Sequence, residues 1–258
     1  MNRLTIIKIG GKVVEDHDNL MMFLNEFNKV SGYKILVHGG GPTATETAAR
    51  LGINTELVDG RRITDESMLN VIVMVYAGLI NKKIVAGLQS LGCNAMGLSG
   101  ADLDLIRAKK RQHPEIDYGF VGDVEDVNTR ELRLLLDEGV VPVIAPVTHD
   151  GNSQLLNTNA DTVAAAMANE LSNYYNVYLV YCFEKKGVLA EITNEESVIS
   201  HLTYDDFLTL KDKGTVVSGM IPKLENGFNA KRNGTKEVII TNAQNISTGR
   251  GTRLVIDQ

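Results

Sequence analysis

The chain has 258 residues, of which 43% are hydrophobic and 22% charged, and its formal net charge is −6. This length is enough to bury a sizeable core, either in one large α/β domain or in two closely packed lobes. No long basic run is present, which argues against a nucleic-acid backbone as the main partner. Small anions remain possible ligands, because a few local cations can outweigh a mildly acidic surface.

The cysteines and the first residues indicate where the protein works. Cys93 and Cys182 lie in apolar surroundings without C-x-x-C spacing, which favours reduced thiols over a zinc site or a disulfide framework. Lys8 follows too few apolar residues for a signal peptide, and by inspection no apolar stretch reaches membrane-spanning length. The histidines show no ligand spacing. We therefore predict a cytoplasmic protein with no membrane partner, no nucleic-acid partner and no protein-built metal site.

In chain order, short apolar runs alternate with helical patterns. Residues 4–9 and 33–38 are short, mainly apolar runs that are followed by glycine, which is typical of buried parallel strands. The alternation predicts an α/β sheet with helices on both faces. The remaining predicted elements are helices over 16–30, 42–51, 67–91 (broken near Gly78), 129–138 and 161–171, a hairpin over 117–128, and strands over 140–145, 177–182, 236–241 and 252–256.

A glycine loop follows the second predicted strand. His38 closes that strand, and Gly39, Gly40 and Gly41 lead into a helical pattern that starts at Pro42. Glycines let the backbone approach a ligand, and the N–H groups of a helix start attract anions. A tight strand-to-helix turn would use the same residues. The loop matches neither the P-loop nor the dinucleotide-binding fingerprint.

Two lysines far apart in the chain also adjoin glycines. Lys8 ends a buried strand just before Gly10 and Gly11, where an ammonium group needs either a cleft with an anion or a path to solvent. Lys223 follows a glycine-containing segment near the other end of the chain. Asp161 and the asparagines before it, Asn157 and Asn159, precede an apolar helix, so any of them can cap that helix. The Asp161 carboxylate could also hold both lysines. If the lysines meet in the fold, they indicate phosphoryl transfer.

Arg62 is the candidate residue for binding a substrate carboxylate. A guanidinium group binds a carboxylate through two parallel hydrogen bonds. Arg62 follows Arg61 directly, so an exposed arginine pair is the competing interpretation.

Taken together, five motifs in order identify a family resemblance. The chain resembles the amino-acid kinase superfamily, and within it most closely the acetylglutamate kinases. The resemblance spans nearly the whole chain, and two further segments, Asn81–Val85 and Val121–Val124, also look like family segments. The five motifs are Lys8-x-Gly10-Gly11, His38-Gly39-Gly40-Gly41, Gly60-x-Arg62-Ile63-Thr64, Asn157-x-Asn159-Ala160-Asp161 and Gly219-Met220-Ile221-Pro222-Lys223.

The resemblance implies an αβα sandwich with a central, mostly parallel sheet. It implies an N-terminal lobe, residues 1–172, for the acyl amino acid and for dimerisation, and a C-terminal lobe, residues 173–258, for ATP. The two lobes are expected to form one intimate structural unit. Mg²⁺ would arrive with ATP, held mainly by its phosphates. The residues matching the nucleotide-binding stretches are Gly10, Gly11, Glu184, Lys185, Lys186, Gly187, Val188, Leu189, Thr215, Val216 and Val217.

The resemblance also implies the reaction. ATP would phosphorylate the γ-carboxylate of an N-acyl-L-glutamate, most simply N-acetylglutamate, in the second step of arginine biosynthesis. Because the acceptor is already ionised, catalysis needs alignment and positive charge rather than a base. Lys8 and Lys223 would supply that charge and Asp161 would organise them. The substrate would be bound by Gly40, Gly41, Arg62 and Asn157.

Four departures from the family pattern affect these expectations. Phe183-Glu184 replaces a small hydroxyl residue and an aspartate, so the negative charge is kept but reaches farther toward the nucleotide. The segment 101–104 lacks the glycines common there, and 241–251 is shorter than usual. Arg61 replaces an aliphatic residue. It is either a surface charge or a group that accommodates a larger or more anionic acyl group, such as succinyl.

Other functions remain as alternatives. Within the superfamily these are kinases acting on another carboxylate or on carbamate. From a different class, a nucleotide or amino-acid sensor could use the same fold. It is disfavoured because a pure binder need not keep Lys8, Asp161 and Lys223 together. Since Lys8 lies so near the start, we expect a homodimer without the N-terminal helix that accompanies strong arginine feedback.

Overall fold

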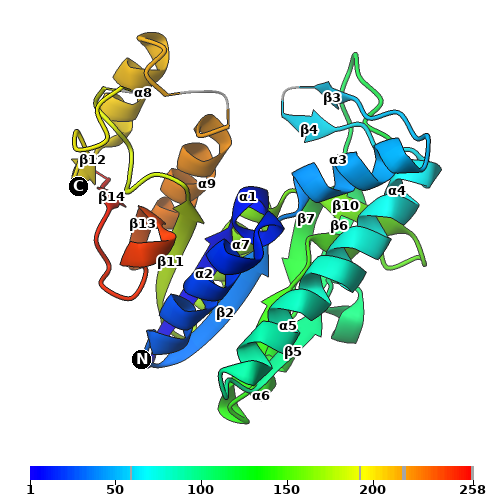
Figure 1. Cartoon of the computed structure of the whole chain (residues 1–258), viewed down its shortest axis with the longest axis horizontal. Helices are drawn as coiled ribbons and strands as arrows, with labels where there is room; N and C mark the ends of the chain where they lie inside the picture. The colour runs from blue at the N-terminus through cyan, green and yellow to red at the C-terminus, as the bar shows by residue number, and fades with distance from the viewer. Residues whose placement is uncertain (59, 192, 217–218, 257–258) are drawn as a thin grey trace.

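A central sheet with helices on both faces forms the body of the molecule. The computed structural model describes residues 1–58, 60–191, 193–216 and 219–256. Figure 1 shows the C-terminal elements on one side of the first two helices, and a group of smaller strands with a long helix on the other. This arrangement confirms the predicted α/β sandwich with its mostly parallel sheet.

The sheet has eight strands in the order β12-β14-β13-β11-β1-β2-β8-β5. All neighbours are parallel except β13 and β14, which are antiparallel. Central strands are covered on both faces, so they need apolar side chains at nearly every position. The strands are β1 Arg3–Ile9, β2 Tyr33–His38, β5 Ala95–Leu98, β8 Val141–Ile144, β11 Asn176–Phe183, β12 His201–Leu202, β13 Glu237–Asn242 and β14 Thr252–Leu254.

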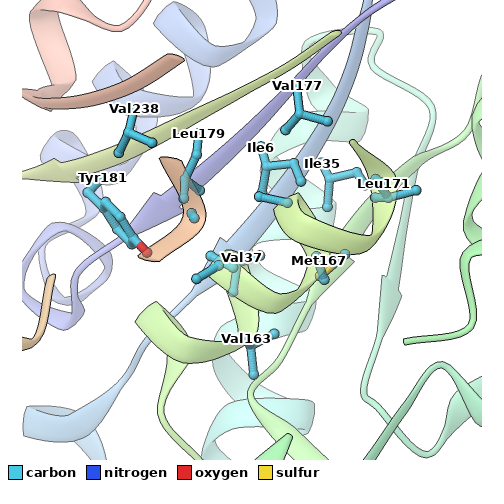
Figure 2. Packing of buried hydrophobic residues seen from close by; sticks show 14 of the residues in the cluster. Ile6, Ile35, Val37, Val163, Met167, Leu171, Val177, Leu179, Tyr181 and Val238 are labelled. Atoms are coloured by element: carbon cyan, nitrogen blue, oxygen red, sulfur yellow. The ribbon is translucent and has the colours of Figure 1, made fainter. Parts of the chain in front are cut away.

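Alternate residues of the strands supply two separate cores. On one face, Ile6 and Leu179 pack against Val163 and Met167 of α7 (Figure 2). On the other face, Ile7 belongs to the second core. The first core involves α6 Thr129–Asp137, α7 Ala160–Leu171, α8 Tyr204–Asp212 and α9 Ile221–Arg232; the second involves α1 Gly11–Glu15, α2 His17–Lys29, α3 Gly41–Arg50 and the long helix described next.

The long helix runs from Glu66 to Ser90 without the predicted break near Gly78. It consists of α4 Glu66–Ile72, a π-helical segment η1 Val73–Ile80, and α5 Asn81–Ser90. Gly78 lies inside the π-helix. The helix therefore continues through this residue with a wider turn and does not break there. π-helical segments occur frequently at functional sites.

The same helix corrects one expectation about apolar stretches. By length and composition alone, Glu66–Ser90 could cross a membrane: its most apolar window has a mean hydropathy of 1.7, and 44% of that window is buried in the molecule. The inspection that found no stretch of this length was therefore wrong. A single helix of this kind is weak evidence for a membrane, because core helices of globular proteins meet the same criteria.

A small closed barrel lies beside the sheet, and the sequence patterns did not predict it. The predicted hairpin over 117–128 is wrong: residues 121–127 form one strand, β7, whose antiparallel partner is β6. The turn-forming Pro114 and Gly119 lie in the connection before β7, so the two strands flank that connection. The barrel strands are β6 Ile106–Lys110, β7 Val121–Val127, β9 Val147–His149 and β10 Leu155–Thr158; a hairpin, β3 Leu57–Val58 and β4 Arg61–Arg62, lies in a separate two-stranded sheet.

Two short 3₁₀ turns occupy the segments where the chain departs from the family pattern. Leu103 and Asp104, in η2 Asp102–Asp104, have φ angles of 55° and 52°. This left-handed conformation costs a residue with a Cβ about 1–2 kcal/mol, which is why glycine would suit these positions. The Asn128 side chain supports the turn by donating to the carbonyl of Leu103, at 3.2 Å. The shortened 241–251 segment contains η3 Ala243–Asn245.

Candidate active site

The site lies where β1 and β2 end and two helices begin. Lys8 is the second-last residue of β1, and its neighbours in the sheet are Val37 of β2 and Tyr181 of β11. The glycine loop after β2 leads into α3, and β10 leads into α7. In an open α/β sheet, ligands bind beyond the carboxyl ends of the strands. The motifs at residues 8, 38–41 and 157–161 therefore meet at one edge.

The carboxylate of Asp161 forms ion pairs with both lysines. Its Oδ1 lies 2.7 Å from the Nζ of Lys8, and its Oδ2 lies 3.1 Å from the Nζ of Lys223. The three side chains are 7%, 7% and 17% exposed for Asp161, Lys8 and Lys223, respectively. The group thus combines one carboxylate with two ammonium groups in a nearly dry setting, which leaves one positive charge in excess.

Capping and charge pairing are divided between two residues. The side chain of Asn159 caps α7 by accepting from the N–H groups of Asp161 and Thr162, at 2.8 and 3.1 Å. Asp161 is therefore not the cap, and both of its carboxylate oxygens are available to the lysines. The sequence left open whether Asp161 caps the helix, and the structure assigns that role to Asn159.

Burial and charge shift the pKa values of this group in opposite ways. Burial favours the neutral form of Asp161, but the ammonium groups of Lys8 and Lys223 outweigh it and hold the pKa of Asp161 below its usual value. Burial lowers the pKa of Lys8, Asp161 opposes this, and Lys223 adds to it. Asp161 thus stays ionised, while Lys8 is an ammonium whose charge is costly.

The glycine loop is tightly enclosed. A Cβ on Gly40 would lie 2.4 Å from the Cδ1 of Ile80, and a Cβ on Gly11 would lie 2.6 Å from the Cδ of Pro42. A larger residue at either position would therefore force the loop or these neighbouring side chains to shift. Within the described part of the chain, neither the Gly40 nor the Gly41 amide donates a hydrogen bond to the protein. Both residues line a cavity, so these amides are available to an anion.

The first cavity, of about 220 Å³, lies on the barrel side of Lys8. Arg62 is 7% exposed and its Nη2 donates to the carbonyl of Gly41 and to the hydroxyl of Thr45, at 3.1 and 2.8 Å. Its Nη1 is buried and lacks a partner among the residues that the structure describes. A buried donor of this kind fits a carboxylate ligand. Predicted substrate residues in the lining are Gly40, Gly41, Arg62 and Asn157, joined by Arg61 and Tyr76.

A second cavity, of about 490 Å³, lies on the other side of Lys8. Its lining contains most of the predicted nucleotide residues: Gly10, Gly11, Glu184, Lys185, Gly187, Val188, Leu189, Thr215 and Val216. Lys186 is absent from that lining and forms an ion pair with Glu196 at 2.6 Å, so the described geometry does not bring its side chain into the cavity. Val217 lies outside the described residues. Lys8 and Gly11 line both cavities.

Several lining residues were missed by the sequence interpretation. Lys12 pairs with Glu184 at 3.2 Å across the mouth of the second cavity, and Phe183 and Met220 add apolar surface. Lys12 directly follows the Gly10-Gly11 motif, which was a usable signal. Phe183 was noted as a departure but not as a lining residue. Met220 lies within a motif that was interpreted through Lys223 alone.

These observations agree with the comparisons. The model of the amino acid kinase family matches residues 3–242, so the chain belongs to the amino acid kinase family. It is 52% identical to an acetylglutamate kinase of Parabacteroides distasonis, covering 98% of this chain and 100% of that protein. It is 54% identical to an acetylglutamate kinase of Bacteroides fragilis, covering 98% and 97%. These identities confirm the resemblance inferred from the motifs.

Solved structures share the fold. The Streptococcus mutans protein smu.665 has a TM-score of 0.82 at 25% identity, covering 98% of this chain and 99% of that one. An N-acetylglutamate synthase of Neisseria gonorrhoeae, complexed with coenzyme A and N-acetyl-glutamate, has a TM-score of 0.84 at 19% identity, covering 99% and 60%. A Giardia lamblia carbamate kinase bound to AMP-PNP has a TM-score of 0.70 at 16% identity, covering 98% of each chain.

We predict that Asp161→Asn lowers the free energy of unfolding by about 3 kcal/mol near neutral pH, because a buried ammonium loses its counter-ion. The loss should shrink as pH rises toward the ordinary lysine pKa of about 10.4. In that range the unfolded chain binds more protons than the folded one, so stability increases with pH. Urea unfolding at a series of pH values measures this.

The control adds Lys8→Met to Asp161→Asn, which removes the buried ammonium as well. This double variant should be more stable than Asp161→Asn alone and should lose the added pH dependence. Equal stability of the two variants across the pH range would contradict the charge argument.

Proposed function

We propose that this protein is an ATP-dependent kinase that phosphorylates the γ-carboxylate of an N-acyl-L-glutamate, with N-acetylglutamate as the first candidate and arginine biosynthesis as the pathway. One observation carries the proposal: two cavities of different character meet at a single ammonium group, that of Lys8. Relatives named acetylglutamate kinase at 52–54% identity support the substrate class.

The acceptor is proposed to occupy the smaller cavity. The partnerless Nη1 of Arg62 suits the substrate's α-carboxylate, and Asn157 suits its acyl-amide end. The free amides of Gly40 and Gly41 then face the γ-carboxylate and the arriving phosphoryl group. A glutamate side chain ionises with a pKa of about 4.3, so the nucleophile is formed without a catalytic base.

The nucleotide is proposed to occupy the larger cavity. Apolar residues such as Val188, Val216 and Met220 can cover a base, while Gly10 and Gly11 let the phosphates approach the end of β1. ATP binds as its Mg²⁺ complex, with the metal held mainly by the phosphates. This assignment gives residues 1–172 the acceptor and residues 173–258 most of the nucleotide, with the Gly10-Gly11 turn shared between them.

The transfer needs alignment and positive charge. A carboxylate oxygen of the acceptor forms a bond to the γ-phosphorus while the bond from that phosphorus to the β–γ bridging oxygen breaks, and ADP leaves with the electron pair. Lys8 and Lys223 neutralise the negative oxygens as they move. Asp161 holds both ammonium groups in place before the substrates arrive, which reduces reorganisation during the reaction.

We predict that Lys8→Ala or Lys223→Ala lowers kcat by about 10²–10³-fold, because each removes a cation from the transferring group. Acylglutamate-dependent ADP release, with hydroxylamine trapping of the acyl phosphate, measures the reaction. Lys29, an exposed lysine on α2 that forms an ion pair with Glu26, provides the control: Lys29→Ala should keep wild-type turnover. A kcat within about tenfold of wild type in either lysine variant would exclude this assignment.

Arg61 supports a second candidate, in which the acyl group carries its own carboxylate, as in N-succinylglutamate. Arg61 lines the acceptor cavity and is partly buried. Burial lowers the pKa of its guanidinium, as does the neighbouring Arg111, while Asp123 opposes the shift. Arg111 is itself engaged by Asp123, at 2.8 Å. The local positive charge favours an anionic acyl group.

We predict that Arg61→Leu lowers kcat/KM for N-succinylglutamate by about 10-fold or more and leaves that for N-acetylglutamate within about threefold, because a charge-assisted hydrogen bond is lost only with the anionic acyl group. Steady-state kinetics with both substrates decides this. Arg130→Leu, at a side chain that is 81% exposed, is the matched control. A strong acetyl preference that Arg61→Leu leaves unchanged would remove the second candidate.

We also propose a cytoplasmic homodimer that buries the exposed apolar side of the long helix. Met74 and Leu79 are 54% and 46% exposed and lie five residues apart on η1. Exposed apolar side chains grouped on one element point to an interaction surface, whereas single scattered ones do not. We predict that Met74→Glu with Leu79→Glu yields monomers in sedimentation experiments. Leu134→Glu on α6 should keep the wild-type mass. An unchanged mass in the double variant would argue against this interface.

A further inference from the structure

A buried histidine controls the direction of the Gly40 amide. His38 is fully buried at the end of β2, and its Nδ1 lies 2.9 Å from the carbonyl oxygen of Gly39. Since a carbonyl oxygen accepts, Nδ1 carries the proton. The Gly39 carbonyl and the Gly40 N–H belong to the same planar trans peptide and point in opposite directions. Holding the carbonyl against the imidazole therefore turns the Gly40 N–H away from His38.

The other ring nitrogen is fixed by Asn81. The Asn81 side-chain amide lies 3.2 Å from the Nε2 of His38 and also donates to the carbonyl of Val143, at 2.9 Å. The amide oxygen of Asn81 in turn accepts from the Nζ of Lys82, at 3.1 Å. Because the amide oxygen of Asn81 faces Lys82, its amide nitrogen faces the imidazole ring of His38 and acts as a donor. Nε2 must then be the unprotonated acceptor, which agrees with the proton on Nδ1.

The π-helical segment explains how Asn81 reaches the ring. The backbone N–H of Asn81 bonds to the carbonyl of Tyr76, five residues earlier. In an α-helix, residue 81 would lie about 140° around the axis from residue 76, at 3.6 residues per turn. The i→i+5 bonding of a π-helix brings it back toward the same side. Asn81 therefore lies on nearly the same side of the helix as Tyr76, which borders the glycine loop.

We propose that His38 is a positioning residue for phosphoryl transfer, which holds the Gly40 N–H toward the acceptor cavity, and that Asn81 keeps its imidazole in the required tautomer. This rests on the proposed kinase function and adds two residues to its machinery. Neither residue lines either cavity. His38 acts through the backbone of the glycine loop, and Asn81 acts through the ring of His38.

The imidazole is suited to this task because it stays neutral. Burial lowers the pKa of His38 to about 4; the bond to Gly39 opposes this, and the ammonium groups of Lys8 and Lys82 add to it. The hydroxyl of Tyr76 on the adjoining η1 is also kept neutral, because burial raises its pKa. The ring is therefore neutral near pH 7, and its two hydrogen bonds select the tautomer.

The test compares kcat and KM for four variants by the acyl phosphate assay. His38→Phe keeps the ring but loses both hydrogen bonds, and it should lower kcat by about 10–100-fold while both KM values stay within about threefold. In His38→Asn, the side-chain Nδ2 is bonded to Cγ, as Nδ1 is in histidine, so it can still donate to the carbonyl of Gly39. This variant should recover most of kcat. Asn81→Leu should also lower kcat, and adding it to His38→Phe should cause no further loss.

Lys34→Met is the matched control. Lys34 is buried on the same strand and the same face, four residues before His38, and donates to three carbonyls at the end of α2. Its loss should lower the unfolding temperature but keep kcat. A kcat within about threefold of wild type in His38→Phe, or equal impairment in His38→Asn and His38→Phe, would overturn the proposal.

A spectroscopic readout separates this proposal from the kinase function itself. Nitrogen-15 NMR of wild-type protein should show a neutral His38 with the proton on Nδ1. The Gly40 amide resonance should shift in His38→Phe and in Asn81→Leu, and return toward wild type in His38→Asn. A wild-type protein that shows these signals but phosphorylates no acylglutamate would refute the function alone. A ring protonated on Nε2 would refute the positioning role, including when His38→Phe fails to fold.

Discussion

The arrangement of the site depends on one buried carboxylate shared by two ammonium groups. Asp161 draws Lys8 from β1 and Lys223 from α9 to the same point, although the three residues lie far apart in the chain. Two buried ammonium groups at this separation would otherwise repel each other and remain poorly solvated. The β1 end, the start of α7 and the start of α9 therefore have to converge for the fold to hold this charge.

Much of this could be predicted from the sequence, because the relevant signals are local. The apolar run at Leu4–Ile9 and the glycines after His38 define strands and their ends through short-range rules. The order of the motifs was enough to recognise the family, which the comparisons confirm. The predicted residues Lys8, Asp161 and Lys223 do meet, which no single motif could have shown.

What could not be predicted depends on contacts distant in sequence. The barrel pairs β7 with β6 and β10, whose short strands lack a clear period of their own. The π-helix differs from an α-helix in which backbone groups are hydrogen-bonded, and residue types do not report this. Gly78 is equally compatible with a break in the helix. Lys185 and Lys186 each form an ion pair, with Glu195 and Glu196 respectively, yet of the two only Lys185 lines the second cavity. Two adjacent residues of the same type carry no sequence signal for this difference. Asn159 rather than Asp161 caps α7, since both residue types favour that position.

The pairing of β1 with β11 determines how the molecule can deform. β1 is bonded along its whole length to β11 on one side and almost as fully to β2 on the other, and the strands that carry the two cavities continue outward from this centre. A hinge between the two functional halves would have to break that ladder. Any movement of one cavity relative to the other would therefore have to twist a continuous sheet. Twisting displaces the central strands less than the outer ones, and Lys8 lies on the central strand β1.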